Sequence, residues 1–323
     1  MKKLFALPLA AAIACGGSFK DEARDAMPSK DAVSMGAPTS GSSSGTALVM
    51  SKESVAGQQS PFWALTVEVA VVFNVPTAAF LDLLSHVVED FEPTSCDATS
   101  CTWQGSGPLD RVDYRLVVSR DGDGKSFDWT LSGAVKGPAT ETFVAFATGV
   151  ATPGPQRHHG SGHFQIDFDK MATLGIAGNA TGLMQVTNYS NVGPAQLAVT
   201  YLGANDTDPN DPPGSKNNVV YSYKNDTSGG GDLDFAVHNT TSGNRFSVHS
   251  RWKNDGRGRA DVTALPTGLA AISVSECWGP APFNVVYFTS TDKTDVAFWA
   301  GADSGAEGQC AYSPAAPSEM SAP

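Results

Sequence analysis

The sequence predicts a mainly β protein: one large antiparallel meander curled into a barrel or half-barrel, with one N-terminal amphipathic helix packed on it. Three observations predict this fold. Apolar and polar residues alternate along many short segments, as in strands that bury one face. Turn-forming residues are frequent, with 33 Gly and 20 Pro in 323 residues. About fourteen such segments follow one another with short links, more than a flat open sheet carries.

The chain begins with an export signal, predicted at residues 1–14. Two lysines precede an apolar run that is too short to span a bilayer, and the small residues Ala12 and Ala14 suit a cleavage site. Cys15, directly after this site, resembles the lipobox cysteine of bacterial lipoproteins. The resemblance implies that Cys15 carries a lipid anchor in the membrane, although Ala12 stands where that family usually has Leu.

The residue after the cysteine bears on the location of the protein. Gly16 stands where the lipoproteins retained in the inner membrane have Asp. The resemblance therefore implies an outer-membrane lipoprotein that faces the periplasm or the cell surface. Residues 12–14, Ala-Ile-Ala, also fit ordinary signal peptidase, which would secrete the protein without an anchor.

The rest of the chain divides into three parts. Residues 15–59 are rich in Ser, Gly, Ala and Asp and predict a flexible linker to the lipid anchor. Residues 60–312 are expected to form a single β-rich domain. Residues 313–323 are expected to be a disordered tail.

The amphipathic helix is predicted from Thr77 onward, with Pro76 in its first turn and Pro93 as its stop. Its apolar residues share one helical face and predict core packing on the sheet: Phe80, Leu83, Leu84, Val87, Val88 and Phe91. Residues 62–73 alternate like a strand but lead straight into this helix, so strand and helix both stay open there.

The clearest part of the meander is residues 217–264, which predict four strands in a row. Their alternating apolar residues are Val219, Tyr221, Tyr223, Leu233, Phe235, Val237, Phe246, Val248, Trp252, Ala260, Val262 and Ala264. In the last hairpin, a three-residue loop at 254–256 with Gly256 in the left-handed region keeps Ala260 on the apolar face. This loop sets Trp252 opposite Gly258, where we expect the ring to cover the bare backbone.

The other strands are predicted in order along the chain. They span residues 112–118, 127–131, 142–147, 164–168, 183–189, 197–202, 272–278, 283–288 and 296–299, with a last short strand near Cys310. Charged residues at outward positions argue against an outer-membrane channel, which needs an apolar outer band.

The same register places polar residues in two rows on the other face of the meander. One row holds Lys224, Asp232, Arg251 and Arg259, and the other holds Ser222, Asp234, His249 and Asp261. Asp234, His249 and Asp261, with Arg251 beside them, are residue types found in catalytic and metal sites. Cross-strand charge pairs on a solvated sheet face explain these rows equally simply, and we expect that arrangement.

No catalytic signature accompanies these rows. The sequence has no nucleophile elbow, HExxH helix, phosphate loop or dinucleotide fingerprint, so we expect no enzyme. A hydrolase that uses Asp234, His249 and Asp261 is the remote alternative, because a triad assembled in space leaves no local motif.

Four cysteines follow Cys15, an even number in a chain expected in an oxidising compartment, so two disulfides are predicted. Three connectivities are possible, and we expect Cys96–Cys101 and Cys277–Cys310. A thiolate metal site would need tighter spacing and more histidines.

Net charge and the spacing of metal-binding residues limit the partners and ligands that we expect for this protein. With 33 acidic and 21 basic residues the net charge is -12, which disfavours nucleic acid. Three histidines lie in a predicted loop, at residues 158, 159 and 163, but the sequence indicates no fourth residue to complete a metal site. A stretch with the oxygen ligands of a calcium loop contains Asp206, Asp208, Asn210 and Asp211. It lacks a Gly at the bend and favours a plain hairpin loop, so we expect no metal and no cofactor.

Scattered motifs also resemble a family of uncharacterised bacterial lipoproteins with a C-terminal antiparallel β domain. The motifs are Cys101-Thr-Trp103, Leu109-Asp110 before Tyr114-Arg115-Leu116, Gly160-Ser-Gly162, Ser250-Arg251-Trp252, Gly256-Arg-Gly258-Arg259-Ala-Asp261, Glu276-Cys277-Trp278 and Cys310-Ala-Tyr312. They span about residues 100–312, and the resemblance implies a single lipid-anchored β domain without a known activity.

Together these features predict a lipid-anchored binding module of the cell envelope, a monomer that carries or receives an apolar molecule between helix and sheet or binds a protein partner on its outer face. The alternative is a structural or surface-interaction lipoprotein with a filled core and no small-molecule ligand.

Overall fold

The computed structural model describes residues 19–38, 56–107, 110–137, 142–205, 212–226, 228–293 and 301–323. The predicted signal segment, the lipidation residue Cys15, residues 39–55 of the predicted linker and the predicted strand at 296–299 lie outside this range. The calcium-loop candidates Asp206, Asp208, Asn210 and Asp211 lie outside it as well.

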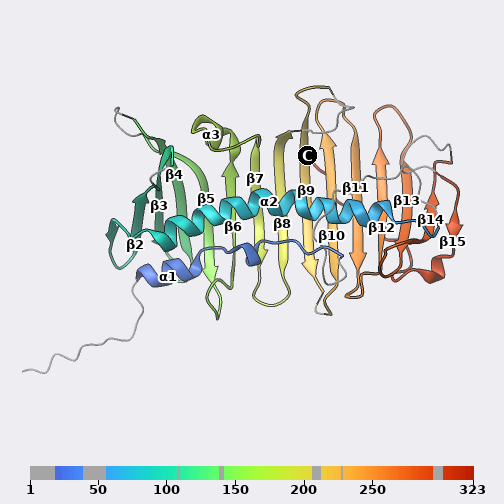
Figure 1. Cartoon of the computed structure of the whole chain (residues 1–323), viewed down its shortest axis with the longest axis horizontal. Coiled ribbons are helices and arrows are strands. Elements are labelled where there is room, and N and C mark those ends of the chain that lie inside the picture. The colour runs from blue at the N-terminus through green and yellow to red at the C-terminus, as the bar shows by residue number, and fades with distance from the viewer. Residues whose placement is uncertain are drawn as a thin grey trace, which may run out of the picture.

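The described chain forms one antiparallel sheet of fifteen strands, arranged in the order of the sequence (Figure 1). The strands are β1 (Ser95–Cys96), β2 (Ser100–Gly105), β3 (Val112–Arg120), β4 (Phe127–Val135), β5 (Val144–Pro153), β6 (Gly160–Asp167), β7 (Leu183–Ser190), β8 (Gln196–Asn205), β9 (Lys216–Asn225), β10 (Gly231–Asn239), β11 (Arg245–Trp252), β12 (Gly258–Leu265), β13 (Ile272–Trp278), β14 (Val285–Ser290) and β15 (Ser304–Gly305). The predicted meander is confirmed.

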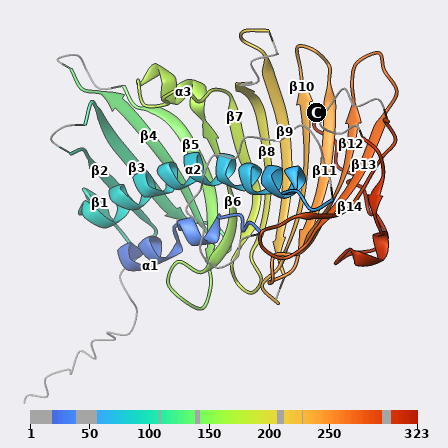
Figure 2. The same ribbon diagram turned by 45° about the vertical axis from the view of Figure 1, so that its right-hand side comes forward.

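The predicted closure into a barrel is wrong. The strand order begins at β1 and ends at β15 without pairing between them, and Figure 2 shows a twisted open sheet with helix α2 (Pro61–Asp90) lying across one face. Because α2 covers the apolar face, that face is buried without closure of the sheet. We call the face that carries α2 the inner face and the opposite one the outer face.

The register of the central strands agrees with the prediction. Trp252 lies opposite Gly258, and Gly256 has a φ of 83°, as the three-residue loop requires. The expected cover of Gly258 is wrong, however. A Cβ at Gly258 would lie 2.3 Å from the ring of Trp278, whereas the ring of Trp252 lies 2.2 Å from a Cβ placed at Gly231. Each ring leans over the glycine of the preceding strand.

Helix α2 is longer than predicted and includes residues 62–73, so the helical alternative holds there. Pro76 lies inside the helix instead of in its first turn. The helix begins after Ser60, whose hydroxyl accepts a hydrogen bond from the Trp63 N–H (2.8 Å). Although α2 is long and apolar enough to cross a membrane, its buried residues, such as Phe73 and Leu84, pack on the sheet as a core helix.

The N-terminus of α2 is fixed to the sheet by Glu276, a fully buried residue of β13. Its Oε1 accepts hydrogen bonds from the Ser60 hydroxyl and from the Phe62 N–H (3.3 Å). One turn later, the Thr66 and Ser250 hydroxyls are hydrogen-bonded at 2.7 Å. A carboxylate suits this position, since the N-terminus of a helix carries partial positive charge.

Residues 19–38 are folded, so the predicted linker is wrong for this part. They form α1 (Phe19–Ala26) and a short 3-10 helix, η1 (Lys30–Ala32), along the side of α2 (Figure 1). Phe19 and Met27 are buried, and the side chain of Asn74 bonds the backbone of Met35 in both directions at 2.8 Å. The sequence on either side is rich in Ser and Gly, so these few buried apolar residues were not recognised as part of the fold.

The C-terminal residues are also ordered against the sheet, contrary to the predicted disordered tail. The segment 310–323, which we call the C-terminal strap, crosses the outer face, and Ala322 is buried. In place of the predicted strand near Cys310, the chain forms β15 and a 3-10 helix, η2 (Glu307–Gln309). The Pro-rich strap has few apolar residues to bury. Hydrogen bonds and other contacts with β9 to β12, described below, hold it on the sheet instead.

Two disulfides, Cys96–Cys101 and Cys277–Cys310, have the expected connectivity. The structure also has elements that the sequence analysis did not find. They include β2, the first residues of β6, and α3 (Phe168–Thr173), which begins where the strand predicted at 164–168 was expected to end.

The disulfide that starts the strap is expected to stabilise the fold more than the other one. The loop closed by Cys277–Cys310 is longer, with a sequence separation of 33 against 5. Loop-closure entropy gives about 4 kcal/mol for the longer loop and about 2 kcal/mol for the shorter. Chemical denaturation of a Cys277→Ser/Cys310→Ser variant should therefore show the larger loss, with Cys96→Ser/Cys101→Ser as the matched control. Equal losses would contradict a strap fastened by this bond.

Candidate functional site

A cavity of about 410 Å³ lies on the inner face, between the middle of α2 and strands β7 to β11. Its lining residues are Val72, Phe73, Pro76, Asn179, Ala180, Thr181, Met184, Tyr201, Ala204, Asn205, Asn217, Val219, Tyr221, Val237 and Phe246. None of them carries a formal charge. The volume falls within the range of small-molecule sites in proteins.

The cavity has an apolar interior and a polar rim. Side chains of α2 and of the middle of the strands line the interior, whereas Asn179, Thr181, Asn205 and Asn217 come from the neighbouring ends of strands and the loop before β7. The Lys216 ammonium donates to Thr181 Oγ1 (2.8 Å) and Asn205 Oδ1 (2.6 Å), and Thr181 Oγ1 donates to the same Asn205 oxygen (3.0 Å). These bonds hold the rim together.

Two tyrosines in the lining stay neutral. Burial, with a smaller effect of Asp169, raises the pKa of Tyr201 to about 12, and its hydroxyl donates to the Thr181 carbonyl (3.0 Å). Burial also raises the pKa of Tyr221, whose ring packs against Phe73 and Phe235. The phenols therefore add neutral surface to the cavity at physiological pH.

The cavity reaches the surface beside an apolar ridge on α2. Val71, Val72 and Val75 are exposed, and Val72 also lines the cavity. Pro76 has no N–H, so the Val72 carbonyl lacks its usual helical donor. The wall of the cavity is thus formed by a turn of α2 that lacks one helical backbone hydrogen bond.

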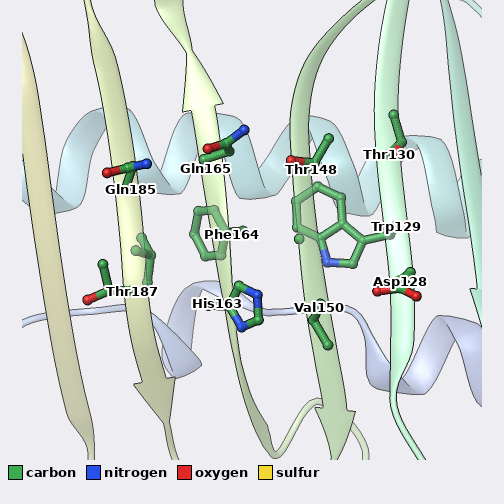
Figure 3. A pocket seen from close by; sticks show the side chains of 12 residues that line it. Asp128, Trp129, Thr130, Thr148, Val150, His163, Phe164, Gln165, Gln185 and Thr187 are labelled. Carbon is green, nitrogen blue, oxygen red and sulfur yellow. The ribbon is translucent and has the colours of Figure 1, made fainter. Parts of the chain in front are cut away.

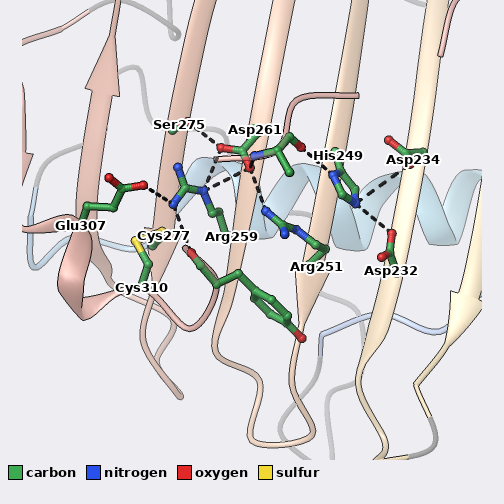
Figure 4. Close-up of polar contacts among 12 residues, drawn as sticks. Asp232, Asp234, His249, Arg251, Arg259, Asp261, Ser275, Cys277, Glu307 and Cys310 are labelled. Carbon is green, nitrogen blue, oxygen red and sulfur yellow. Dashed lines mark hydrogen bonds and ion pairs between the residues drawn. A yellow bond between two sulfur atoms is a disulfide. The ribbon is translucent and has the colours of Figure 1, made fainter. Parts of the chain in front are cut away.

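The polar rows lie on the outer face, as predicted, with the strap over them (Figure 4). Cross-strand pairing joins Asp234 to His249 and His249 to Asp261. The prediction of a solvated face is wrong at Asp261 and Arg259, since both are buried beneath the strap.

Asp261 is the centre of a structural network. Its carboxylate accepts from Arg259 Nε (2.8 Å), from Arg251 (3.1 Å) and from the Ser275 hydroxyl (2.5 Å). The N–H of Ala316 in the strap donates to it at 2.9 Å. Such a buried charge is tolerated because its partners surround it.

His249 makes different contacts. Its Nδ1 lies 2.6 Å from the Ala316 carbonyl, and its Nε2 lies 3.0 Å from Asp232 Oδ1 and 4.0 Å from Asp234 Oδ2. Figure 4 shows the ring between the strap and these two carboxylates. The Asp234, His249 and Asp261 side chains thus lie near one another, but no hydrogen bond joins His249 to Asp261 in the described structure, and a catalytic relay through all three is not formed.

Burial and hydrogen bonding act against each other on His249. Burial alone would lower its pKa, but the bonds to Asp232 and to the Ala316 carbonyl, with the charge of Asp234, outweigh it and raise the pKa above the ordinary value. Burial raises the pKa of Asp234, against the opposing effect of His249. Two acceptors on the two ring nitrogens favour the doubly protonated ring.

Ligand atoms of Asp232, Asp234 and His249 lie within 4.8 Å of one another, a spacing that a divalent metal ion could bridge. Sequence reasoning placed Asp232 in the neighbouring row and missed it as a member of this group, although the two-residue period puts it on the same face as Asp234. The predicted loop histidines do not join it: His159 Nδ1 lies 3.3 Å from the Asn191 carbonyl, and His158 Nε2 lies 3.9 Å from Glu89.

A second hollow lies on the outer face across β4 to β7, with a volume of about 480 Å³ (Figure 3). Thr130, Thr148, Gln165 and Gln185 follow one another in cross-strand register along it. The sequence analysis did not find this row, because isolated Thr and Gln residues on a polar face look like ordinary solvated positions.

No protein-family model, no curated protein and no solved structure matches this chain.

The raised pKa of His249 implies that the stability of the protein depends on pH. The contribution of such a group to the free energy of unfolding is fully present below the unfolded-state pKa of about 6.5 and is lost as pH rises through the folded-state value. The difference in free energy of unfolding between wild type and His249→Gln should therefore shrink as pH rises above about 6.5, measured by urea denaturation at a series of pH values.

His238→Gln is the matched control, since the His238 ring also contacts a strap carbonyl, that of Pro323 (2.7 Å). This variant should keep the pH dependence that His249 supplies. Parallel stability curves for wild type and His249→Gln across this range would contradict the assignment.

Proposed function

We propose that this protein is a lipid-anchored binding module of the cell envelope that holds an apolar ligand between α2 and the sheet. The observation that carries the proposal is the cavity of about 410 Å³ with an apolar interior. A ligand there would gain from burying apolar surface, about 25 cal/mol per Å².

Close packing on either side of the cavity supports a defined site instead of a loose core. Toward the C-terminal end of α2, Phe80 stacks between Trp129 and Phe164, with ring centroids 6.4 and 6.0 Å apart. Toward the N-terminal end, Trp63 stacks on Phe283 at 4.4 Å. The cavity of about 410 Å³ thus lies between these two packed regions, beside Val72 and Pro76 in the middle of the helix.

The second candidate is a structural or surface-interaction lipoprotein without a small-molecule ligand. The strap and its buried Arg259–Asp261 pair favour it, because they rigidify the outer face and add no cavity. A protein partner on the outer face would belong to this candidate.

Export and anchoring are part of the proposal. Two disulfides fit an oxidising compartment, and acylation of Cys15 would tether the folded part to the membrane. The long apolar helix is engaged with the sheet, so the proposed anchor is the lipid and not α2. A monomer is proposed, as one chain supplies the whole cavity.

Filling the cavity should weaken binding of an apolar ligand. Val219 lines it, whereas its neighbour Val220 faces the opposite side of the same strand. We expect the full chain to bind the neutral fluorophore N-phenyl-1-naphthylamine with increased emission, Val219→Trp to weaken binding at least about tenfold, and Val220→Trp to bind like wild type. Absence of binding by wild type, or equal binding by both variants, would remove the cavity as the site.

Anchoring is tested separately from binding. Cys15→Ala should move the mature protein from the membrane fraction to the soluble exported fraction, as followed by immunoblotting after cell fractionation. An unchanged distribution would support ordinary secretion or another means of attachment. Wild-type protein extracted with detergent should carry acyl chains at its N-terminus by mass spectrometry.

A further inference from the structure

The chemistry of the rim identifies the class of ligand more closely, and this inference rests on the proposed function. Four uncharged polar residues, Asn179, Thr181, Asn205 and Asn217, lie at one end of an otherwise apolar cavity. A purely apolar molecule would leave these groups facing hydrocarbon, which is costly. A molecule with one polar end matches both parts of the lining.

Asn217 is the residue that points to a polar end on the ligand. It is half-buried in the cavity lining, and its side-chain amide makes no hydrogen bond with the rest of the described chain. The other rim amide from a strand, Asn205, is already bonded to Thr181, Lys216 and the Asn179 carbonyl. The free amide can both donate and accept.

The strand pairing is irregular at this place. Between Tyr201 and Ala204 the pairing of β8 with β9 shifts, and Gly203 adopts a φ of 71°. Its N–H donates to Asn218 Oδ1 (3.0 Å) instead of following the regular ladder. Bulges of this kind re-aim side chains next to binding sites. Asn217 lies opposite Ala204, directly beyond the shift.

The uncharged lining argues against an ionic head group. None of the lining residues is charged. The Lys216 ammonium lies beside the rim, outside the lining, where the neutral Thr181 and Asn205 oxygens accept two of its hydrogen bonds. An anionic head inside the cavity would find no cation among the lining residues, and a cationic head would find no carboxylate there. Burying an unpaired charge costs far more than burying a hydroxyl or an ester.

We propose that the cavity binds a single-chain neutral amphiphile, with its hydrocarbon chain under α2 and an uncharged hydroxyl, ester or amide head hydrogen-bonded to Asn217 and Asn179. The ridge formed by Val71, Val72 and Val75 lies beside the cavity and gives the chain an apolar path into it.

Three probes with the same twelve-carbon acyl or alkyl length separate the head groups: 1-monolauroylglycerol, laurate and dodecylammonium. Isothermal titration calorimetry of the full chain, below the micellar concentration of each probe, should give an affinity for 1-monolauroylglycerol at least about tenfold above that for either ion. Equal or tighter binding of laurate or dodecylammonium would overturn the proposal.

Variants test the role of the amide. Asn217→Leu should weaken 1-monolauroylglycerol binding about tenfold. N-phenyl-1-naphthylamine should bind this variant at least as tightly as wild type, because the substitution makes the lining more apolar. Asn179→Leu, in an exposed loop, is the second variant and should give a smaller loss in the same direction. Asn225→Leu is the matched control, because Asn225 lies on the same strand and face at the far end from the cavity.

The outcomes distinguish this inference from the proposed function. If N-phenyl-1-naphthylamine binds and Val219→Trp blocks it, but Asn217→Leu leaves the affinity for 1-monolauroylglycerol unchanged, the head-group assignment is wrong and the apolar site stands. If neither the fluorophore nor any of the three amphiphiles binds, both are wrong.

Discussion

The structure depends on a single helix that buries the apolar face of a sheet which never closes. A barrel would satisfy its edge strands by pairing them, but here α2 supplies the apolar partner along the sheet. Its position is therefore critical, and Glu276 fixes it by accepting hydrogen bonds from the first residues of the helix inside the core. The cavity follows from the same arrangement. Helix α2 cannot follow the twist of the sheet along its whole length. It packs closely where aromatic rings fill the gap, at Trp63 and at Phe80, and the cavity lies between these two contacts.

The outer face is organised by a different interaction. Its charged rows are held by the strap, which brings backbone donors and acceptors over side chains that would otherwise be solvated. Arg259 shows the result: it bonds Asp261, Glu307 and the Tyr312 carbonyl, and it is buried. These partners offset the cost of removing both charges from water. The residues that most resemble a catalytic row thus hold the C-terminal strap on the outer face.

Period-two alternation was enough to predict the meander and its central register, because each one-residue error would have turned a row of apolar side chains outward. The two disulfides were expected on other grounds, the even number of cysteines and an oxidising compartment. Reasoning from sequence pattern failed where the decisive contacts are distant in sequence. Pro76 looked like a helix start because nothing local shows that the sheet stabilises the residues before it. Phe19 and Met27 were hidden in a polar segment, and the strap has almost no apolar residues. A ligand site between helix and sheet was predicted, but its lining residues were not. Asn217 lies beside an irregularity in strand pairing, which no sequence motif indicates.

An open sheet of this length raises the question of its two ends. Unpaired strand edges recruit further strands, from other copies or from misfolded chains. Here both terminal strands, β1 and β15, are only two residues long, and β1 is closed onto β2 by the Cys96–Cys101 bond. A neighbour could form very few hydrogen bonds with such a stub. The short ends therefore protect the molecule against fibre-like stacking of one sheet on the edge of another.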